Sequence, residues 1–178
     1  LLFGLSDFTV RLPSVIAAEV MVITTFLLGR AIGDRKTAWL AVGALLGMYQ
    51  FWLAGTEARV DMVFATCVTV LIAGFLFWYL KAHQAGRALC YIAAACAVLA
   101  KGPGGVVLPG LVIVGFLMAE KQLRLLWKFW SWPLVGIALV IDVGWYALAY
   151  HVGGTEFLVK QILRENVQRF FGTGSISS

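Results

Sequence analysis

Six long apolar stretches, separated by short polar connections, make up most of this chain. Residues 1–150 contain all of them, near 13–29, 37–54, 60–80, 87–100, 104–119 and 131–150. A helix that crosses a bilayer needs about 17 to 25 predominantly apolar residues. The pattern therefore predicts an all-α polytopic integral membrane protein with about six transmembrane helices.

The fourth and fifth stretches are short. Their helices either tilt little or thin the bilayer locally, or they meet in a turn, residues 102–105, that dips below the interface. After the last span, residues 151–178 are predicted to form an extracytoplasmic tail, with an amphipathic helix near 156–171.

Composition agrees with a membrane protein. The chain has 178 residues, of which 61% are hydrophobic and 13% charged, and its mean hydropathy is +0.90. Soluble domains are only about half apolar. The net charge of +5 comes without a basic stripe interleaved with aromatic residues, so nucleic acid is not an expected partner. Cys67, Cys90 and Cys96 lie within apolar runs without CxxC spacing, which argues against a disulfide or zinc framework.

The distribution of basic residues predicts the orientation. Eight lie in the connections 30–36, 81–87 and 120–130, whereas the opposite connections carry only Arg11, Arg59 and Lys101. Short cytoplasmic loops are enriched in Lys and Arg. Both termini and the connections that contain Asp61 and Lys101 are therefore expected on the extracytoplasmic side.

This topology brings an acid and several cations to one membrane face. Asp61 begins the third span, Lys101 lies at the turn after the fourth, and Glu57 and Arg59 lie in the loop before Asp61. A carboxylate can act as a general base, and Lys can bind a phosphate. The alternatives are a helix N-terminal acid for Asp61 and a snorkelling turn lysine for Lys101. Glycines after Lys101 would let a bulky ligand approach the backbone closely.

Two further acids lie inside predicted spans. Glu19 is in the first and Asp142 in the sixth. An intramembrane acid is either functional or a hydrogen-bonded interior carboxyl. These two acids favour the rival reading, a transporter or channel subunit, although no internal repeat supports it. His151, Glu156 and Glu165 have no metal-ligand spacing, so no metal site is predicted and a divalent ion stays an open alternative.

Several strings are similar to those of a known enzyme family. They are Leu2 to Ser14, Arg59-Val60-Asp61, Ala100-Lys101-Gly102-Pro103, Gly144-Trp145-Tyr146 and Glu165 to Phe170. Their order and spacing resemble the phospholipid-carrier-dependent glycosyltransferases of the protein O-mannosyltransferase and aminoarabinose (lipid A) transferase type, which have the GT-C fold. The resemblance covers nearly the whole chain, and it is most specific at Arg11-Leu12-Pro13-Ser14 and Ala100 to Pro103.

The resemblance implies a reaction and a site. A sugar would move from a polyprenyl-phosphate donor to a lipid A, protein or glycan acceptor by an inverting displacement, at the extracytoplasmic face of a bacterial inner membrane. Asp61 would be a catalytic residue, the family's second acidic residue near the active site, and Lys101, Gly102, Arg59 and Arg169 would bind the donor phosphate. No nucleotide-binding loop is needed for such a donor.

The chain departs from the family pattern in two places. The first-loop acid that acts as the catalytic base in the family would lie upstream of Leu1, so we expect this chain to be an internal fragment that is inactive alone. Asn166 stands where some relatives have a histidine, which counts against a metal site.

Overall fold

The computed structural model describes residues 7–57 and 60–158, and every regular element in these ranges is a helix. The predicted site residues Arg59 and Arg169 lie outside them, as does most of the predicted tail helix. The elements are α1 (Asp7–Ile32), α2 (Arg35–Leu46), α3 (Tyr49–Thr56), α4 (Val60–Lys81), α5 (Gln84–Lys101), α6 (Gly104–Ala119), α7 (Leu125–Phe129) and α8 (Trp132–Leu158).

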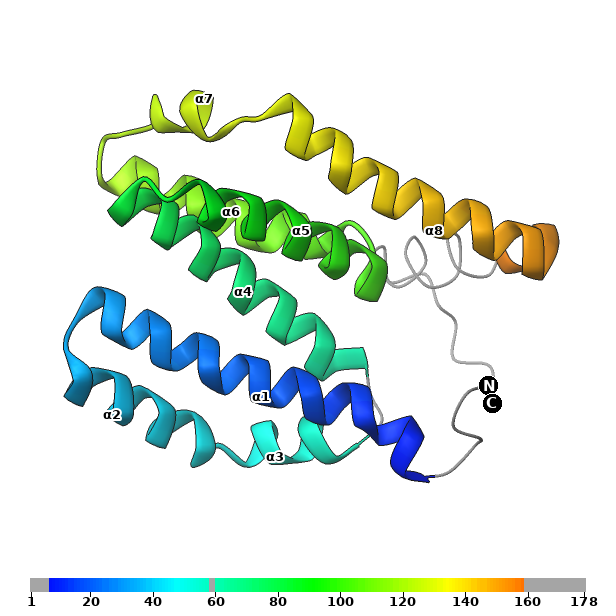
Figure 1. Ribbon diagram of the computed structural model, residues 1–178, viewed down its shortest axis with the longest axis horizontal. Coiled ribbons are helices and arrows are strands. Elements are labelled where there is room, and N and C mark those ends of the chain that lie inside the picture. The colour runs from blue at the N-terminus through cyan, green and yellow to red at the C-terminus, as the bar shows by residue number, and fades with distance from the viewer. Residues whose placement is uncertain (1–6, 58–59, 159–178) are drawn as a thin grey trace, which may run out of the picture.

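The helices form a layered bundle (Figure 1). α2 and α3 pack along α1, and α4 lies between α1 and the pair α5 and α6. α8 packs against α5 on the side away from α1. The fold is the all-α membrane architecture that the apolar pattern predicts.

Helices cover all six predicted spans, but their lengths differ. α4 and residues Thr9–Ile32 of α1 are long and apolar enough to cross a membrane, and the bent pair α2 and α3 would make a third span. α5 and α6 have 18 and 16 residues. At about 1.5 Å per residue they reach roughly 27 and 24 Å, less than the ~30 Å hydrocarbon core. The count of six spans therefore stays a prediction.

The second predicted span, 37–54, is broken rather than straight. α2 and α3 meet at an angle of 67° around Gly47 and Met48. A break leaves backbone carbonyls without helical partners, which is costly in an apolar environment. The indole Nε1 of Trp52 donates a hydrogen bond of 2.6 Å to the carbonyl of Leu46 and so satisfies one of them.

Two apolar clusters hold the bundle together. The larger joins α4, α5 and α6 around the buried Phe75 and Leu117, and α7 packs against it through Leu125, Leu126 and Phe129. The smaller joins α1, α3 and α4 through Ala17, Phe51 and Met62. Within this second interface the hydroxyl of Thr66 donates a buried 2.9 Å hydrogen bond to the carbonyl of Ala17, which fixes α4 against α1.

The backbones of α4 and α5 approach closely at two glycines. A Cβ placed on Gly74 would lie 2.6 Å from the carbonyl oxygen of Gly86, and one placed on Gly86 would lie 2.8 Å from the oxygen of Gly74. Real side chains do not tolerate such distances, so both positions require glycine. This contact sets how the two antiparallel helices align along their length.

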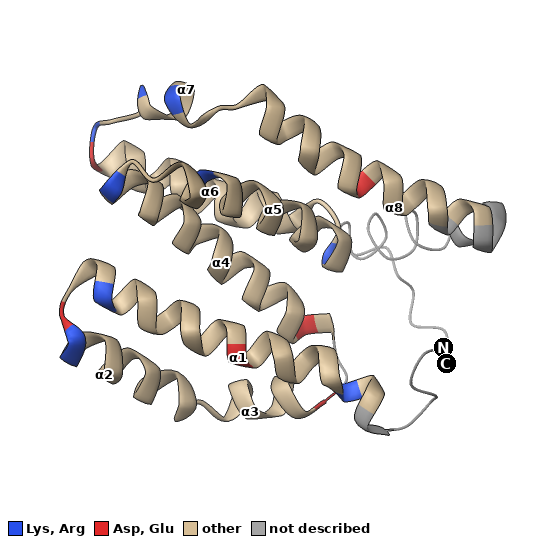
Figure 2. Cartoon of the chain, viewed as in Figure 1, with Lys and Arg blue, Asp and Glu red and all other residues tan. Residues whose placement is uncertain are grey.

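Basic residues gather at one end of the bundle. Figure 2 shows Lys and Arg where α1 ends, where α2 begins and around α7, with far fewer at the opposite end. At the basic end, Asp34 caps α2 by accepting hydrogen bonds of 2.8 Å from the backbone N–H and the hydroxyl of Thr37. These bonds, the backbone one above all, hold the pKa of the Asp34 carboxyl below its usual value.

The asymmetry of charge predicts which residues face outward. In a background free of Cys67, Cys90 and Cys96, we expect the variant Thr56→Cys to react with an impermeant thiol reagent added to intact cells. The variant Gln84→Cys should react only after the cells are opened. Both positions are exposed and lie at opposite ends of the bundle. Labelling of position 84 in intact cells would reverse the orientation.

The glycine contact predicts a loss of stability on adding one methyl group. Gly74→Ala should lower the free energy of unfolding by about 1–3 kcal/mol, because a backbone oxygen occupies the space of the new Cβ. Thermal unfolding in detergent measures this as a lower Tm. Gly110→Ala in α6 is the matched control, since nothing lies within 4 Å of a Cβ there. Equal Tm values for the two variants would contradict the packing argument.

Candidate active site

Asp61 and Lys101 lie at the same end of the bundle because α4 and α5 are antiparallel. Asp61 is in the first turn of α4 and Lys101 in the last turn of α5. Gly74 of α4 faces Gly86 and Cys90 of α5. Asp61 precedes Gly74 by 13 residues, and Lys101 follows the midpoint between Gly86 and Cys90 by the same 13. The glycine contact thus places the two charged residues opposite each other.

The two side chains form an ion pair. The Nζ atom of Lys101 contacts the Oδ1 atom of Asp61, and the side chains are 46% and 48% exposed. The same Nζ lies 5.2 Å from the ring centroid of Phe64, one turn further along α4. A cation at this distance from an aromatic face is attracted to it. Lys101 is therefore held in place by a carboxylate and a ring while about half of its surface stays accessible.

The turn after Lys101 depends on glycine at two positions. Gly102 has φ 76° and ψ −159°, a conformation that is essentially restricted to glycine. Its N–H donates a 2.6 Å hydrogen bond to the carbonyl of Val98 and ends α5. Three residues later, a Cβ on Gly105 would lie 2.6 Å from the carbonyl carbon of Ala97. The predicted tight turn is confirmed, and it fixes where α5 presents Lys101.

The two candidate intramembrane acids, Glu19 and Asp142, lie on other helices than this pair. Glu57 is half-buried at the end of α3. Glu19 is exposed on α1. Asp142 is half-buried on α8, and its Oδ1 atom has no hydrogen-bond partner among the described residues. α1 and α8 lie on opposite sides of α4 and α5 (Figure 1), so the two intramembrane acids do not form a shared polar site.

A shallow apolar groove lies near the same end of the bundle, between α1 and α4. It has a volume of about 450 Å³, and its α4 lining consists of Val63, Thr66 and Cys67. At about 100° per residue, Val63 and Thr66 lie roughly 140–160° around α4 from Asp61, on the far side of the helix. The groove therefore belongs to the interface of α1 with α4 and not to the ion pair.

No group of three or more His, Cys, Asp or Glu side chains in residues 7–57 and 60–158 is arranged to hold a metal ion. The metal-ligand candidates of the tail are His151, which is exposed at the end of α8, together with Glu156 and Glu165. The side chains of the last two lie outside the described part.

Sequence reasoning did not identify Phe64 as part of the site. The signal was present, because an aromatic residue three positions after Asp61 lies on the same face of a helix. Its contact with Lys101 could not be inferred, because that contact depends on the alignment of α4 with α5.

Comparison with known proteins decides the family. The sequence model of the family described as dolichyl-phosphate-mannose-protein mannosyltransferase matches residues 1–161. This match includes both members of the ion pair and the turn that follows Lys101. The chain belongs to this family. The GT-C-type glycosyltransferase resemblance of the motifs is thereby confirmed.

Individual relatives agree with this family. An undecaprenyl phosphate-alpha-4-amino-4-deoxy-L-arabinose arabinosyl transferase of Shewanella sediminis is 28% identical over 95% of this chain and 31% of its own length. A second such transferase, of Proteus mirabilis, is 29% identical over 97% of this chain and 32% of its own. An uncharacterized protein of Aquifex aeolicus is 27% identical over 96% and 34%. No solved structure matches the chain significantly.

The relatives that this chain matches are much longer than the chain itself. The chain spans about a third of the length of the relatives it matches. The match shows the family of this chain over residues 1–161, and the structure shows its all-α fold.

The geometry of the turn after Lys101 predicts a difference between two neighbouring glycines. Gly102→Ala should destabilise the protein by about 1–3 kcal/mol, because an L side chain is strained at this φ and ψ. Gly104→Ala, two residues later, meets nothing within 4 Å and is the control. Thermal unfolding of both variants in detergent tests this. A Gly102→Ala protein as stable as the control would show that the turn relaxes freely.

Proposed function

We propose that this chain is part of a membrane glycosyltransferase that moves a sugar from a polyprenyl-phosphate donor to an acceptor at the extracytoplasmic face. The observation that carries the proposal is the half-exposed ion pair of Asp61 and Lys101. The family is named after a sugar linked to a lipid phosphate, dolichyl-phosphate-mannose, and so are its arabinosyl transferase relatives, whose names give undecaprenyl phosphate and aminoarabinose. The acceptor class stays open among a lipid such as lipid A, a protein and a glycan.

Lys101 is suited to bind the donor phosphate. Its ammonium group has three N–H donors, so it can hold a phosphate oxygen while it stays close to Asp61. As the glycosidic bond breaks, the leaving phosphate gains negative charge, and a fixed cation stabilises that charge. Gly102, which follows directly, is itself buried, and its conformation ends α5 at Lys101 and so fixes where the lysine is presented.

Asp61 is suited to act nearer the sugar or the acceptor. Its carboxylate is half-exposed, so a hydroxyl or amine of an acceptor has access to it. In this position it acts as a base or as an electrostatic stabiliser of the developing positive charge on the sugar. Pairing with Lys101 orients the carboxylate.

The ion pair contributes little to folding, which favours a functional role for it. Partly exposed pairs are typically worth only about 0–1 kcal/mol. The α4 and α5 interface is instead held by the apolar cluster around Phe75. If a donor phosphate replaces the Asp61 carboxylate as the partner of Lys101, the packing of α4 against α5 therefore stays intact.

The side of the membrane follows from charge. The ion pair lies at the end of the bundle opposite the basic connections (Figure 2). Since basic loops stay in the cytoplasm, the pair would face outward, where lipid-linked sugars are used without nucleotides. The transporter alternative needs polar groups gathered at the midplane, and Glu19 and Asp142 do not meet there in the described bundle.

The proposal predicts different kinetic effects for the two charged residues. In the full-length protein, Lys101→Ala should weaken binding of a polyprenyl-phosphate sugar about tenfold or more, since a charge-assisted bond is worth roughly 1.5–3 kcal/mol. Lys101→Arg should retain part of the affinity. Asp61→Asn should lower turnover more than donor affinity. Binding titrations and initial rates measure both quantities.

Two controls make this test specific. Lys81→Ala removes a lysine from the last turn of α4, at the other end of the bundle, and should leave binding and turnover unchanged. A double variant of Asp61 and Lys101 separates their coupling from their individual roles. If Lys101→Ala binds and turns over the donor like the parent protein, Lys101 is only a turn residue and the proposal fails.

A further inference from the structure

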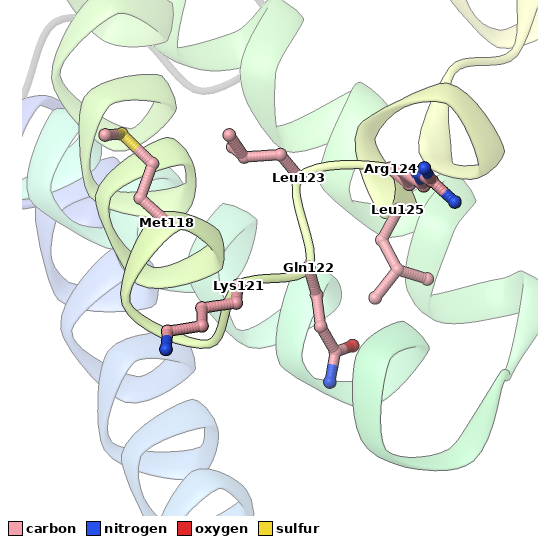
Figure 3. A pocket seen from close by; sticks show the side chains of 6 residues that line it. All are labelled: Met118, Lys121, Gln122, Leu123, Arg124 and Leu125. Carbon is pink, nitrogen blue, oxygen red and sulfur yellow. The ribbon is translucent and has the colours of Figure 1, made fainter.

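The connection between α6 and α7 contains a cavity at the end of the bundle opposite the ion pair. The cavity has a volume of about 600 Å³ and is lined by Met118, Lys121, Gln122, Leu123, Arg124 and Leu125 (Figure 3). Apart from Met118, its lining lies within residues 120–130, which carry three of the eight basic residues at this end. None of these residues belongs to the proposed sugar-transfer site.

The cavity is built on a tightly bonded helix ending. The N–H of Lys121 donates to the carbonyl of Met118 at 3.0 Å, and the N–H of Gln122 donates to that of Leu117 at 2.8 Å. This bond pair normally has glycine at the position of Lys121, because the residue there adopts a left-handed conformation. Lys121 has φ 55°. The chain therefore holds a lysine where the backbone would favour glycine.

The lining combines polar and apolar groups. In Figure 3, Lys121 and Gln122 extend to one side of the loop, whereas Met118 and Leu123 lie on the other. Arg124 points away from them at the start of α7. A cation and an amide beside two flexible apolar side chains match a ligand that has a phosphate next to hydrocarbon.

The surroundings place this connection at a membrane surface. α7 packs onto the core through Leu125, Leu126 and Phe129, while Trp127 is 86% exposed. Trp130 and Trp132 are also exposed, and their rings lie 5.4 Å apart. Exposed tryptophans concentrate at the level of lipid head groups.

The local charge is positive. Lys128 follows on α7, and its carbonyl accepts a 3.2 Å hydrogen bond from Nη1 of Arg87, so Arg87 of α5 joins the same surface. Glu120, next to Lys121, is the opposing charge in this connection. Cations next to a membrane attract anionic lipids.

We propose that the connection between α6 and α7 binds the phosphate head group of an anionic phospholipid, with Lys121 and Gln122 on the phosphate and Met118 and Leu123 against the lipid body. A phospholipid fits better than free phosphate, because the apolar half of the cavity and the exposed tryptophans would gain nothing from an inorganic ion. This second lipid site is independent of sugar transfer and lies in the other leaflet.

Native mass spectrometry of the full-length protein tests the site, with phosphatidylglycerol and phosphatidylcholine titrated separately. The variant Lys121→Asn with Arg124→Gln removes both charges, and asparagine tolerates the left-handed conformation at 121. We expect phosphatidylglycerol to bind on the order of tenfold more weakly to this variant, since each cation near a membrane surface contributes to anionic lipid binding. Binding of phosphatidylcholine should not change.

The matched control is Arg35→Gln with Lys36→Gln, which removes two exposed charges from the start of α2 at the same end of the bundle. It should change phosphatidylglycerol binding less than twofold. Equal losses in both variants would mean general surface attraction and would overturn the site. Unchanged binding in the first variant would overturn it too. Displacement of phosphatidylglycerol by millimolar inorganic phosphate would show that the ligand is free phosphate.

Discussion

The close approach of α4 and α5 at Gly74 and Gly86 is the constraint on which the rest of the structure depends. Two helical backbones reach such distances only where neither has a side chain. Gly74 lies in the second half of α4 and Gly86 in the first turn of α5, and this contact sets how the rest of the two antiparallel helices align. At one end it brings Asp61 to Lys101, and at the other it lets α7 pack onto the cluster around Phe75.

A fixed alignment matters because the ion pair cannot produce it. Partly exposed charges contribute too little to position two helices, whereas an apolar interface with a close backbone contact does so strongly. The charged residues are therefore positioned by packing elsewhere. A ligand can then displace or share the ion pair without disturbing the fold, which is the property that a phosphate site needs.

Much of this arrangement could be predicted from the sequence. Helices occupy all six apolar stretches, and Asp61 and Lys101 lie at one end of the bundle, as their positions at the ends of successive stretches predict. The break at Gly47 and Met48 was missed, because hydropathy measures how apolar a segment is and not whether it is straight. Phe64 was missed for a different reason. Its contact with Lys101 depends on how α4 and α5 align, and no local pattern encodes that alignment.

The two ends of the bundle differ in the number and arrangement of their charged residues, and the difference follows from the connections between the helices. The α5–α6 turn is only two residues long, is built on Gly102, and leaves room for few charges, so its single lysine is paired with an acid. The α6–α7 connection and the helix ends on either side of the α1–α2 connection are exposed and carry several cations. A lone paired cation can select one phosphate at a defined position, whereas spread cations favour a charged surface. The same physical rule thus separates an end of the bundle where a cation is paired with an acid from an end where several cations are spread over the surface.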